Sequence, residues 1–420
     1  VAWEEMSPEA SRVVAVSFVD PTRMGTPFVV SDEYPAFRPA LAGRNDACWL
    51  AWDEVVDDDQ YEIFFARLDA QGAVKRTRVT RNPALDAAAA IALDPGGRVW
   101  LAWHSDRTPR RQWDIPKWPM VRCFDGTRWL QPAQPVPGRQ DDPRGEDQGF
   151  EFPTLQFDGA GGLWLFGRPS PGFNAARFAG SAWSPVARYA RPGWGGRGQY
   201  VRTARAGGAL WTVRRDLHRI YLAPIALTGA LEESPTPQLV PLTSPPSPLL
   251  PAPAAPPDSF TAPRAAAEAA AGKVFFGDVH MHTSFSDGMG TLDEIYQRAQ
   301  TAYRLDFAVV TDHDDFIGNR ILPSEWAYMQ AVADLFNRPP NFVTLCGFEW
   351  TDARHPKGDG HKNVYYRGHG PMLWHTDPEV ADGPKLFKRL AAARGICFPH
   401  HIGWTGVDWE THEHRIQTNV

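Results

Sequence analysis

The stretch ACWLAWDE, residues 47–54, carries two tryptophans in an apolar run and returns three times along the chain in altered form. The later copies are RVWLAWHS at 98–105, GLWLFGRP at 162–169 and ALWTVRRD at 209–216. Their first tryptophans follow one another at intervals of 51, 64 and 47 residues, at Trp49, Trp100, Trp164 and Trp211. A recurrence of about 50 residues is typical of repeat architectures, so the N-terminal part is predicted to consist of stacked supersecondary units.

Each copy lies within a pattern of four short strands. A strand and a turn rich in Asp, Asn, Pro and Gly precede it, as in AIALDPGG at 90–97, and two strand-like runs follow it. Four strands in chain order predict an antiparallel meander, which is typical of a β-propeller blade. Four full blades are predicted, and residues 13–31 resemble the outer strands of another. The tryptophans are interpreted as core residues, and the long loops are expected to offer a surface for a protein or glycan partner.

The chain is predicted to divide into three parts. Residues 1–233 form the all-β propeller of four or more four-stranded blades, and residues 234–272 form a linker rich in Pro and Ala. Eleven prolines between 234 and 263 remove backbone donors and favour an extended spacer, although Leu239 and Val240 could hold it against a domain surface. From residue 273 to 420 strand and helix patterns alternate, which indicates a mainly parallel α/β sheet or barrel with active groups at the C-terminal strand ends.

Composition excludes two classes of function. The net charge of −6 gives no basic footprint for nucleic acid, and no apolar run approaches the length of a membrane-spanning helix. Cys48, Cys123, Cys346 and Cys397 lack paired metal spacing and are interpreted as mostly buried free thiols. The numbered chain begins with Val1, which is expected of a processed or incomplete product, and the compartment stays open with export favoured over the cytoplasm.

Histidines are concentrated in the last part of the chain, where eleven of the 13 follow residue 272. In GDVHMHTSFSDG, residues 277–288, His280 and His282 are two positions apart, so they share one face of the expected strand. Further His, Asp and Glu residues stand where other expected strands begin or end: Asp287, His313, Glu349, His361, His400 and His401. A single buried histidine is more often a hydrogen-bond partner than a ligand, but this joint pattern predicts a cage for two or three divalent cations.

The motifs HMHTSFSDG, VVTDH, GFE, GHKNV and FPHH resemble those of the PHP superfamily, named for polymerase and histidinol phosphatase. The resemblance covers residues 273–420 and implies a distorted (βα)7-type barrel with a metal-dependent phosphoesterase activity. A finer likeness is to a PHP-like group common in exported bacterial proteins. The cations implied are manganese, zinc or iron, and the substrate implied is phosphorylated.

The resemblance also implies roles for individual residues. The implied metal ligands are His280, His282, Asp287, His313, Glu349, His361 and His400. Glu349, Asp312 and His401 are assigned to the catalytic group, with Asp278, Asp314 or Asp315 as further carboxylates that orient the imidazoles. PHP domains also have a late Asp-x-His pair, which does not follow here, so the barrel is expected to be truncated at its C-terminus.

Two other functions stay open. The first is hydrolysis of a substrate without phosphate, such as an amide or a lactone, although the lysine that usually bridges the metals of such enzymes has no counterpart at an expected strand end. The second is a non-catalytic binding or assembly protein built on the propeller, with a degenerate barrel.

Overall fold

The computed structural model describes the 420-residue chain except at 21, 32–33, 45–46, 57–59, 69–73, 83, 107–116, 137–149, 169–172, 190–201, 217–218, 226–235, 243–271, 317–318, 353–358 and 401–420. The chain divides into two compact units, one of residues 1–6 and 10–254 and the other of residues 7–9 and 255–420. The boundary between the two units, between residues 254 and 255, lies within the predicted linker.

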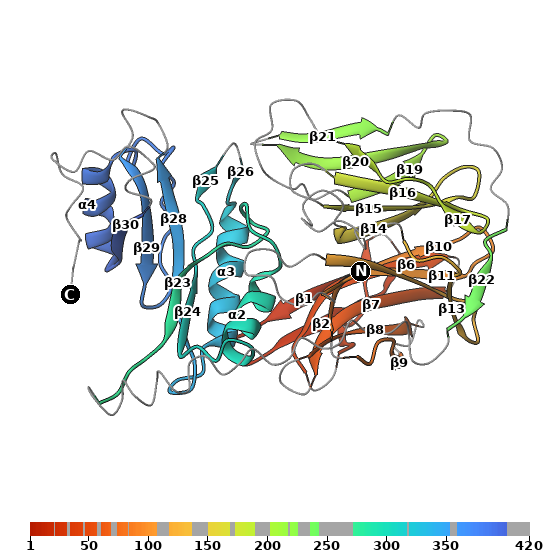
Figure 1. Cartoon of the computed structure of the whole chain (residues 1–420), viewed down its shortest axis with the longest axis horizontal. Coiled ribbons are helices and arrows are strands. Elements are labelled where there is room, and N and C mark those ends of the chain that lie inside the picture. Colours follow the sequence, from red (N-terminus) through yellow and green to blue (C-terminus); the bar gives the residue numbers. More distant parts are fainter. Residues whose placement is uncertain are drawn as a thin grey trace. The chain divides into compact units, whose positions relative to one another are not determined.

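The N-terminal unit is a succession of antiparallel sheets, coloured red to green in Figure 1. The first sheet has the order β1-β2-β5, and a hairpin of β3 and β4 follows β2 in the chain. Their bounds are β1 Ala2–Met6, β2 Ser11–Ala15, β3 Phe18–Asp20, β4 Arg23–Met24 and β5 Phe28–Val29. The second sheet is the predicted four-stranded meander, with β6 Ala36–Arg44, β7 Ala47–Val56, β8 Gln60–Leu68 and β9 Val74–Arg78.

The third and fourth sheets repeat this plan, and the fifth has three strands among the described residues. The third contains β10 Leu85–Leu93, β11 Val99–Asp106, β12 Lys117–Phe124 and β13 Trp129–Pro132, and β22 Leu239–Pro241 pairs with β13 at its outer edge. The fourth contains β14 Glu151–Phe157, β15 Leu163–Arg168, β16 Phe173–Ala179, β17 Ala182–Trp183 and β18 Ala187–Tyr189. The fifth contains β19 Arg202–Ala206, β20 Ala209–Asp216 and β21 Arg219–Pro224. Within the predicted linker, β22 therefore holds Leu239 and Val240 on a sheet edge.

The sheets pack on one another through their first strands. β6 contacts β1 and β10, β10 contacts β14, and β14 contacts β19. This succession of first strands is the arrangement of inner strands in propeller blades. The predicted blade-like repeat therefore describes this part of the chain.

A shared turn explains why two of the tryptophan phrases recur. Asp94 accepts a hydrogen bond from the Arg98 backbone N–H at 2.8 Å and from Trp100 Nε1 at 3.3 Å. Asp158 accepts from the Gly162 N–H and from Trp164 Nε1, both at 2.9 Å. The spacing of four and six residues is identical. An aspartate in the turn thus satisfies both the hairpin backbone and the indole of the following strand.

A second device is repeated at the first strand of three sheets. Arg38, Ala88 and Phe152 have φ angles of 52°, 57° and 49°, a conformation that costs non-glycine residues about 1–3 kcal/mol. Each lies at a register shift between its strand and the next. The backbone N–H of each donates to a side chain from the preceding sheet, namely Glu4 at 3.1 Å, Asp53 at 3.0 Å and His104 at 3.1 Å, respectively. These bonds help to offset the backbone strain.

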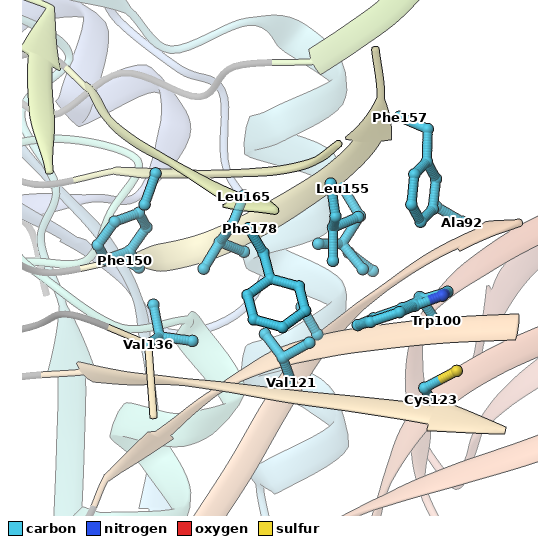
Figure 2. Packing of buried hydrophobic residues seen from close by; sticks show 14 of the residues in the cluster. Ala92, Trp100, Val121, Cys123, Val136, Phe150, Leu155, Phe157, Leu165 and Phe178 are labelled. Carbon is cyan, nitrogen blue, oxygen red and sulfur yellow. The ribbon is translucent and has the colours of Figure 1, made fainter. Parts of the chain in front are cut away.

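A large apolar cluster of described residues lies between the third and fourth sheets of the N-terminal unit (Figure 2). Trp100 is fully buried there, with ring centroids 6.0 Å from Phe157 and 6.1 Å from Phe178. Leu155 and Leu165 of the fourth sheet and Cys123 of the third belong to the same cluster. The alternate residues of both sheets therefore form one common core.

The cysteines supply a first prediction. Burial raises the pKa of the Cys123, Cys346 and Cys397 thiols to about 12, and it also raises that of the less buried Cys48. Because the thiolate is the reactive form, we expect these three cysteines to be unreactive toward Ellman's reagent at pH 8 in the folded protein. All four should react after unfolding in guanidinium chloride. Fast, stoichiometric labelling of four thiols in the native protein would contradict this placement.

The C-terminal unit, cyan to blue in Figure 1, contains two three-stranded sheets. The first is parallel, with β23 Gly277–Met281, β24 Phe307–Val310 and β27 Val343–Thr344. The second is antiparallel, with β28 Cys346–Asp352, β29 Gly360–Tyr366 and β30 Ile396–His400. A short hairpin joins β25 Asp315–Phe316 and β26 Asn319–Arg320. The described helices are α2 Leu292–Thr301, α3 Pro323–Phe336 and α4 Gly383–Ala393.

The predicted (βα)7-type PHP barrel over 273–420 is wrong for the described residues. A barrel of that type needs a helical crossover between successive parallel strands. Here β28 and β29 pair antiparallel along their whole length, from Cys346 opposite Tyr366 to Asp352 opposite Gly360. The pattern of helices at 292–301, 323–336 and 383–393 suggested alternation along the whole segment, whereas β28, β29 and β30 form a separate antiparallel sheet.

Candidate metal centre

Six of the seven predicted metal ligands come together around Glu349, which is fully buried on β28. The ligand atoms form three overlapping groups in which all atoms lie within 4.8 Å of one another. These groups are His280, His282 and Glu349; His282, Asp287 and His313; and His313, Glu349 and His361. The fold therefore brings together six residues that were predicted from the sequence. Cation binding by these residues stays a prediction.

Three strands bring these side chains to one place. His361 lies on β29 opposite Thr351, so it shares a face with Glu349, two residues before Thr351. His313 follows β24 and forms an isolated parallel bridge with Glu349. His280 lies on β23, and His282 lies just beyond the end of that strand. The ligands thus come from the junction of the parallel and the antiparallel sheet.

Three hydrogen-bond acceptors converge at the centre of this group. His282 Nε2 lies 3.1 Å from His280 Nε2 and 3.2 Å from Glu349 Oε2, and His280 Nε2 lies 4.0 Å from the same oxygen. A cation about 2.1 Å from each ligand separates neighbouring ligand atoms by about 3.0 to 3.4 Å in octahedral or tetrahedral geometry. The two distances from His282 Nε2 fit this range, and the third, 4.0 Å between His280 Nε2 and Glu349 Oε2, is longer.

Hydrogen-bond acceptors lie beside the outer ring nitrogens of two of the histidines. His280 Nδ1 lies 3.1 Å from Asn363 Oδ1 and 2.9 Å from Thr311 Oγ1, both of which can accept from an Nδ1–H. Ser286 Oγ donates to the Asp312 carboxylate and lies 3.0 Å from His282 Nδ1, so the hydroxyl accepts from that ring. The Nε2 lone pairs of both imidazoles therefore point at each other and at Glu349.

His313 is held in the same way. The Thr351 hydroxyl donates to the Glu349 backbone carbonyl at 2.9 Å, so its oxygen accepts from His313 Nδ1 at 2.7 Å. His313 Nε2 then carries the lone pair and lies 3.6 Å from Asp287 Oδ2. Outer hydrogen bonds that fix the tautomer and leave the other nitrogen available are typical of metal-binding histidines.

Electrostatics keep Glu349 ionised. Burial alone would raise its pKa, but the neighbouring imidazoles of His282, His361 and His313 hold the pKa well below its usual range. His361 Nδ1 lies 2.6 Å from Glu349 Oε1. Burial lowers the pKa of His282, but its bond to Glu349 and the charges of Asp312 and Asp287 give a net rise. A carboxylate with imidazoles on both oxygens is a suitable shared ligand for cations.

The other predicted residues lie beside this group or outside the described chain. His400 ends β30, and its ring centroid is 3.8 Å from that of His280. Asp312 accepts from the Thr283 N–H at 2.8 Å and from the Thr283 hydroxyl at 2.5 Å, so its carboxylate orders the loop that carries Asp287. Asp278 accepts from the His280 N–H at 2.9 Å. His401, predicted as catalytic, lies outside the described residues.

Several contacting residues were not predicted. Asn363 and Thr351 hold His280 and His313, and Thr311 Oγ1 lies 2.9 Å from His280 Nδ1. Asn363 could have been found, because it follows His361 by two positions on a strand and so shares its face. His375 was also missed, and its Nδ1 lies 2.9 Å from an Asp314 carboxylate oxygen. No sequence pattern links His375 to Asp314, which lies 61 residues away.

One aromatic ring borders the group, since Phe316 stacks on His313 with centroids 4.3 Å apart. Asp287 is 36% exposed, the most accessible of the six gathered side chains. The group is therefore open to solvent at the Asp287 carboxylate.

Residues 318–382 match a family model described as protein of unknown function (DUF3604). This segment includes Glu349, His361 and His375. No curated protein matches the sequence. Among the described residues, no helix has both the length and the apolar character needed to cross a membrane.

Solved structures share only a distant likeness to the chain. A family 117 glycoside hydrolase from Zobellia galactanivorans is 13% identical with a TM-score of 0.34, over 45% of this chain and 65% of that protein. A protein of unknown function from Dyadobacter fermentans is 14% identical with a TM-score of 0.40, over 53% and 69%. A GH43 endo-arabinanase from Bacillus licheniformis is 10% identical with a TM-score of 0.31, over 53% and 88%. The chain spans just under two thirds of the first of these proteins.

These findings correct the predicted family and activity. The matching family model is one of unknown function, and the described C-terminal strands do not close a barrel. The resemblance to the PHP superfamily and the PHP-type phosphoesterase with a phosphorylated substrate are therefore wrong. Two of these solved structures are glycoside hydrolases by name, but their TM-scores carry no argument about the activity or substrate of this chain.

Proposed function

We propose that the C-terminal unit holds a divalent-cation centre that serves a hydrolase. The observation that carries this proposal is the convergence of His280 Nε2, His282 Nε2 and Glu349 Oε2, three acceptors with separations of 3.1, 3.2 and 4.0 Å. Lone pairs at such short range repel one another unless a cation or a proton lies between them. The outer hydrogen bonds of both imidazoles favour a metal cation, because an Nδ1–H that is bound on the outer side leaves Nε2 free to act as a ligand.

The donor set fits such an ion. His280, His282 and Glu349 would hold a first cation, and His313 Nε2 with Asp287 would hold a second. Imidazole nitrogen and carboxylate oxygen are common ligands of zinc and manganese. A bound divalent cation supplies Lewis acidity, which lowers the pKa of a coordinated water to about 7 and polarises a carbonyl oxygen.

The chemistry of the proposed centre points to a carbonyl substrate. A bound cation would polarise a carbonyl oxygen. Its positive charge would also offset the carboxylates of Glu349, Asp287 and Asp312, so the charge of the site does not by itself select the substrate. We therefore infer hydrolysis of a carboxylic ester, a lactone or an amide. Phe316, which stacks on His313, would contact the apolar part of such a substrate.

Removal of the cation tests this function. We expect the purified chain, stripped with a chelator and reloaded with zinc or manganese, to bind one or two ions by elemental analysis. Hydrolysis of p-nitrophenyl acetate should fall to background after stripping and return with the metal, because the water loses its activating cation. A His282→Ala variant should lose both properties. His369→Ala is the matched control, since His369 is exposed and pairs with Asp334.

Two results would refute the proposal. One is a reloaded parent protein that holds no more metal than His282→Ala. The other is esterase activity that is the same with and without chelator, which would indicate that His282 and Glu349 share a proton rather than a cation.

A further inference from the structure

A second buried histidine–carboxylate pair lies in the C-terminal unit outside the ligand group. His375 donates to Asp314 twice, through its backbone N–H at 2.6 Å and through Nδ1 at 2.9 Å. The His375 side chain is 13% exposed and that of Asp314 is fully buried. The two residues are buried and joined by hydrogen bonds, yet the proposed hydrolysis does not use them.

This pair faces the other side of the antiparallel sheet. Along β28, Glu349 and Thr351 point to the ligand side, so Trp350 points to the opposite side. Trp350 meets the His375 ring edge to face, with centroids 6.2 Å apart, and the Lys362 ammonium lies over the same indole. His375 therefore cannot reach a cation on the ligand side directly.

A chain of hydrogen bonds nevertheless joins the two sides. Asp314 Oδ1 accepts from the Thr351 backbone N–H at 2.8 Å. The hydroxyl of Thr351 accepts from His313 Nδ1 at 2.7 Å. Asp314 also follows His313 directly, and its own N–H donates to the Glu349 carbonyl at 2.9 Å. The position of the Asp314 carboxylate thus fixes the backbone of Thr351, and through it the ring of His313.

We propose that His375 is a positioning residue for the cation centre, which acts through Asp314 and Thr351 to fix the tautomer and orientation of His313. The inference rests on the proposed function, because His313 must be a ligand for its orientation to matter. Without the His375 ring, the buried Asp314 carboxylate would lose its Nδ1 donor and would keep only the backbone N–H of residue 375, so its position would be less fixed. A shift of the Asp314 carboxylate would displace the Thr351 backbone and with it the hydroxyl that accepts from His313, so that His313 Nδ1 would turn toward Glu349 Oε2, 3.2 Å away.

A purely structural role is the alternative. A buried His–Asp pair also stabilises a fold, because a buried carboxylate that loses its donors is costly. That role predicts a lower unfolding midpoint for a His375 variant with an unchanged His313 ring and unchanged metal affinity. The two roles therefore differ in what happens at His313.

The test compares His375→Ala, His375→Asn and the control His369→Ala in the full chain. Zinc affinity is measured by competition with a chromophoric chelator, and the His313 ring by 15N NMR of labelled protein. We expect His375→Ala to weaken zinc binding roughly 10- to 100-fold, as is usual for partners of ligating histidines. The His313 Nδ1–H signal should also broaden or shift. His375→Asn should restore most of the affinity, because its amide can donate to Asp314.

Three outcomes decide the matter. Zinc affinities and His313 signals equal to the parent in both His375 variants would overturn the inference. A lower unfolding midpoint with an unchanged His313 signal would overturn it too, in favour of the structural role. A parent protein that binds no zinc would instead refute the proposed function, so the two failures are distinguishable.

Discussion

Glu349→Gln is expected to abolish both cation binding and hydrolysis. The substitution keeps the shape of the side chain but removes the negative charge that four imidazoles surround, with closest nitrogens 2.6 to 4.0 Å away. A neutral amide is a poor metal ligand, and its NH2 group would occupy one of the two positions now taken by carboxylate oxygens. We expect at least a 100-fold loss of zinc affinity and about a 1,000-fold loss of esterase activity. Competition with a chelator and steady-state kinetics measure the two effects.

Glu379→Gln is the matched control for this change. Glu379 is 70% exposed and pairs with the exposed Arg389, so its charge can be removed without effect on the ligand group. Its zinc affinity and activity should equal those of the parent. Normal metal content in Glu349→Gln would contradict the proposed centre.

Trp100→Ala is expected to produce the largest loss of stability in the N-terminal unit. The indole is fully buried between Phe157 and Phe178, and its Nε1 donates to Asp94 in the adjacent turn. The change would leave a cavity between two sheets and remove one bond of the turn, at a cost of about 3–5 kcal/mol. Guanidinium chloride unfolding followed by tryptophan fluorescence measures the loss, because twelve of the 17 tryptophans precede residue 234.

Trp211→Ala, at the equivalent position of the last repeat, provides the comparison. Trp211 is only partly buried, and its Nε1 donates to the exposed backbone carbonyl of Ala206 at 3.1 Å. Its loss should cost less than half as much. Equal costs at the two positions would mean that the core between the third and fourth sheets is not the main source of stability.

The repeat architecture could be predicted because its signal is local. The aspartate of the turn and the tryptophan six residues later lie in one short sequence segment, and this segment recurs along the chain. Strand bulges at Arg38, Ala88 and Phe152 could not be predicted in this way. Their positive φ angles depend on acceptors from a different sheet, and nothing in their local sequence calls for glycine-like backbone.

The candidate site was partly predictable for a similar reason. Alternation along a strand placed His280 and His282 on one face, and the strand ends supplied Glu349 and His361. The PHP barrel was wrong, because the same residues occur where a parallel and an antiparallel sheet meet, and ligand spacing along the chain does not distinguish these two folds. The support from Thr351, Asp314 and His375 was not visible, because contacts between residues tens of positions apart depend on the tertiary structure.

The three capped bulges also affect how the repeats could be rearranged. Each receives a different acceptor from its predecessor, a glutamate, an aspartate and a histidine in turn. A module moved to another place in the series would meet an acceptor side chain of a different length and chemical type. A duplicated module would therefore keep its backbone donor, and the bulge at its new junction would form only if the preceding sheet placed an acceptor side chain within reach of that N–H.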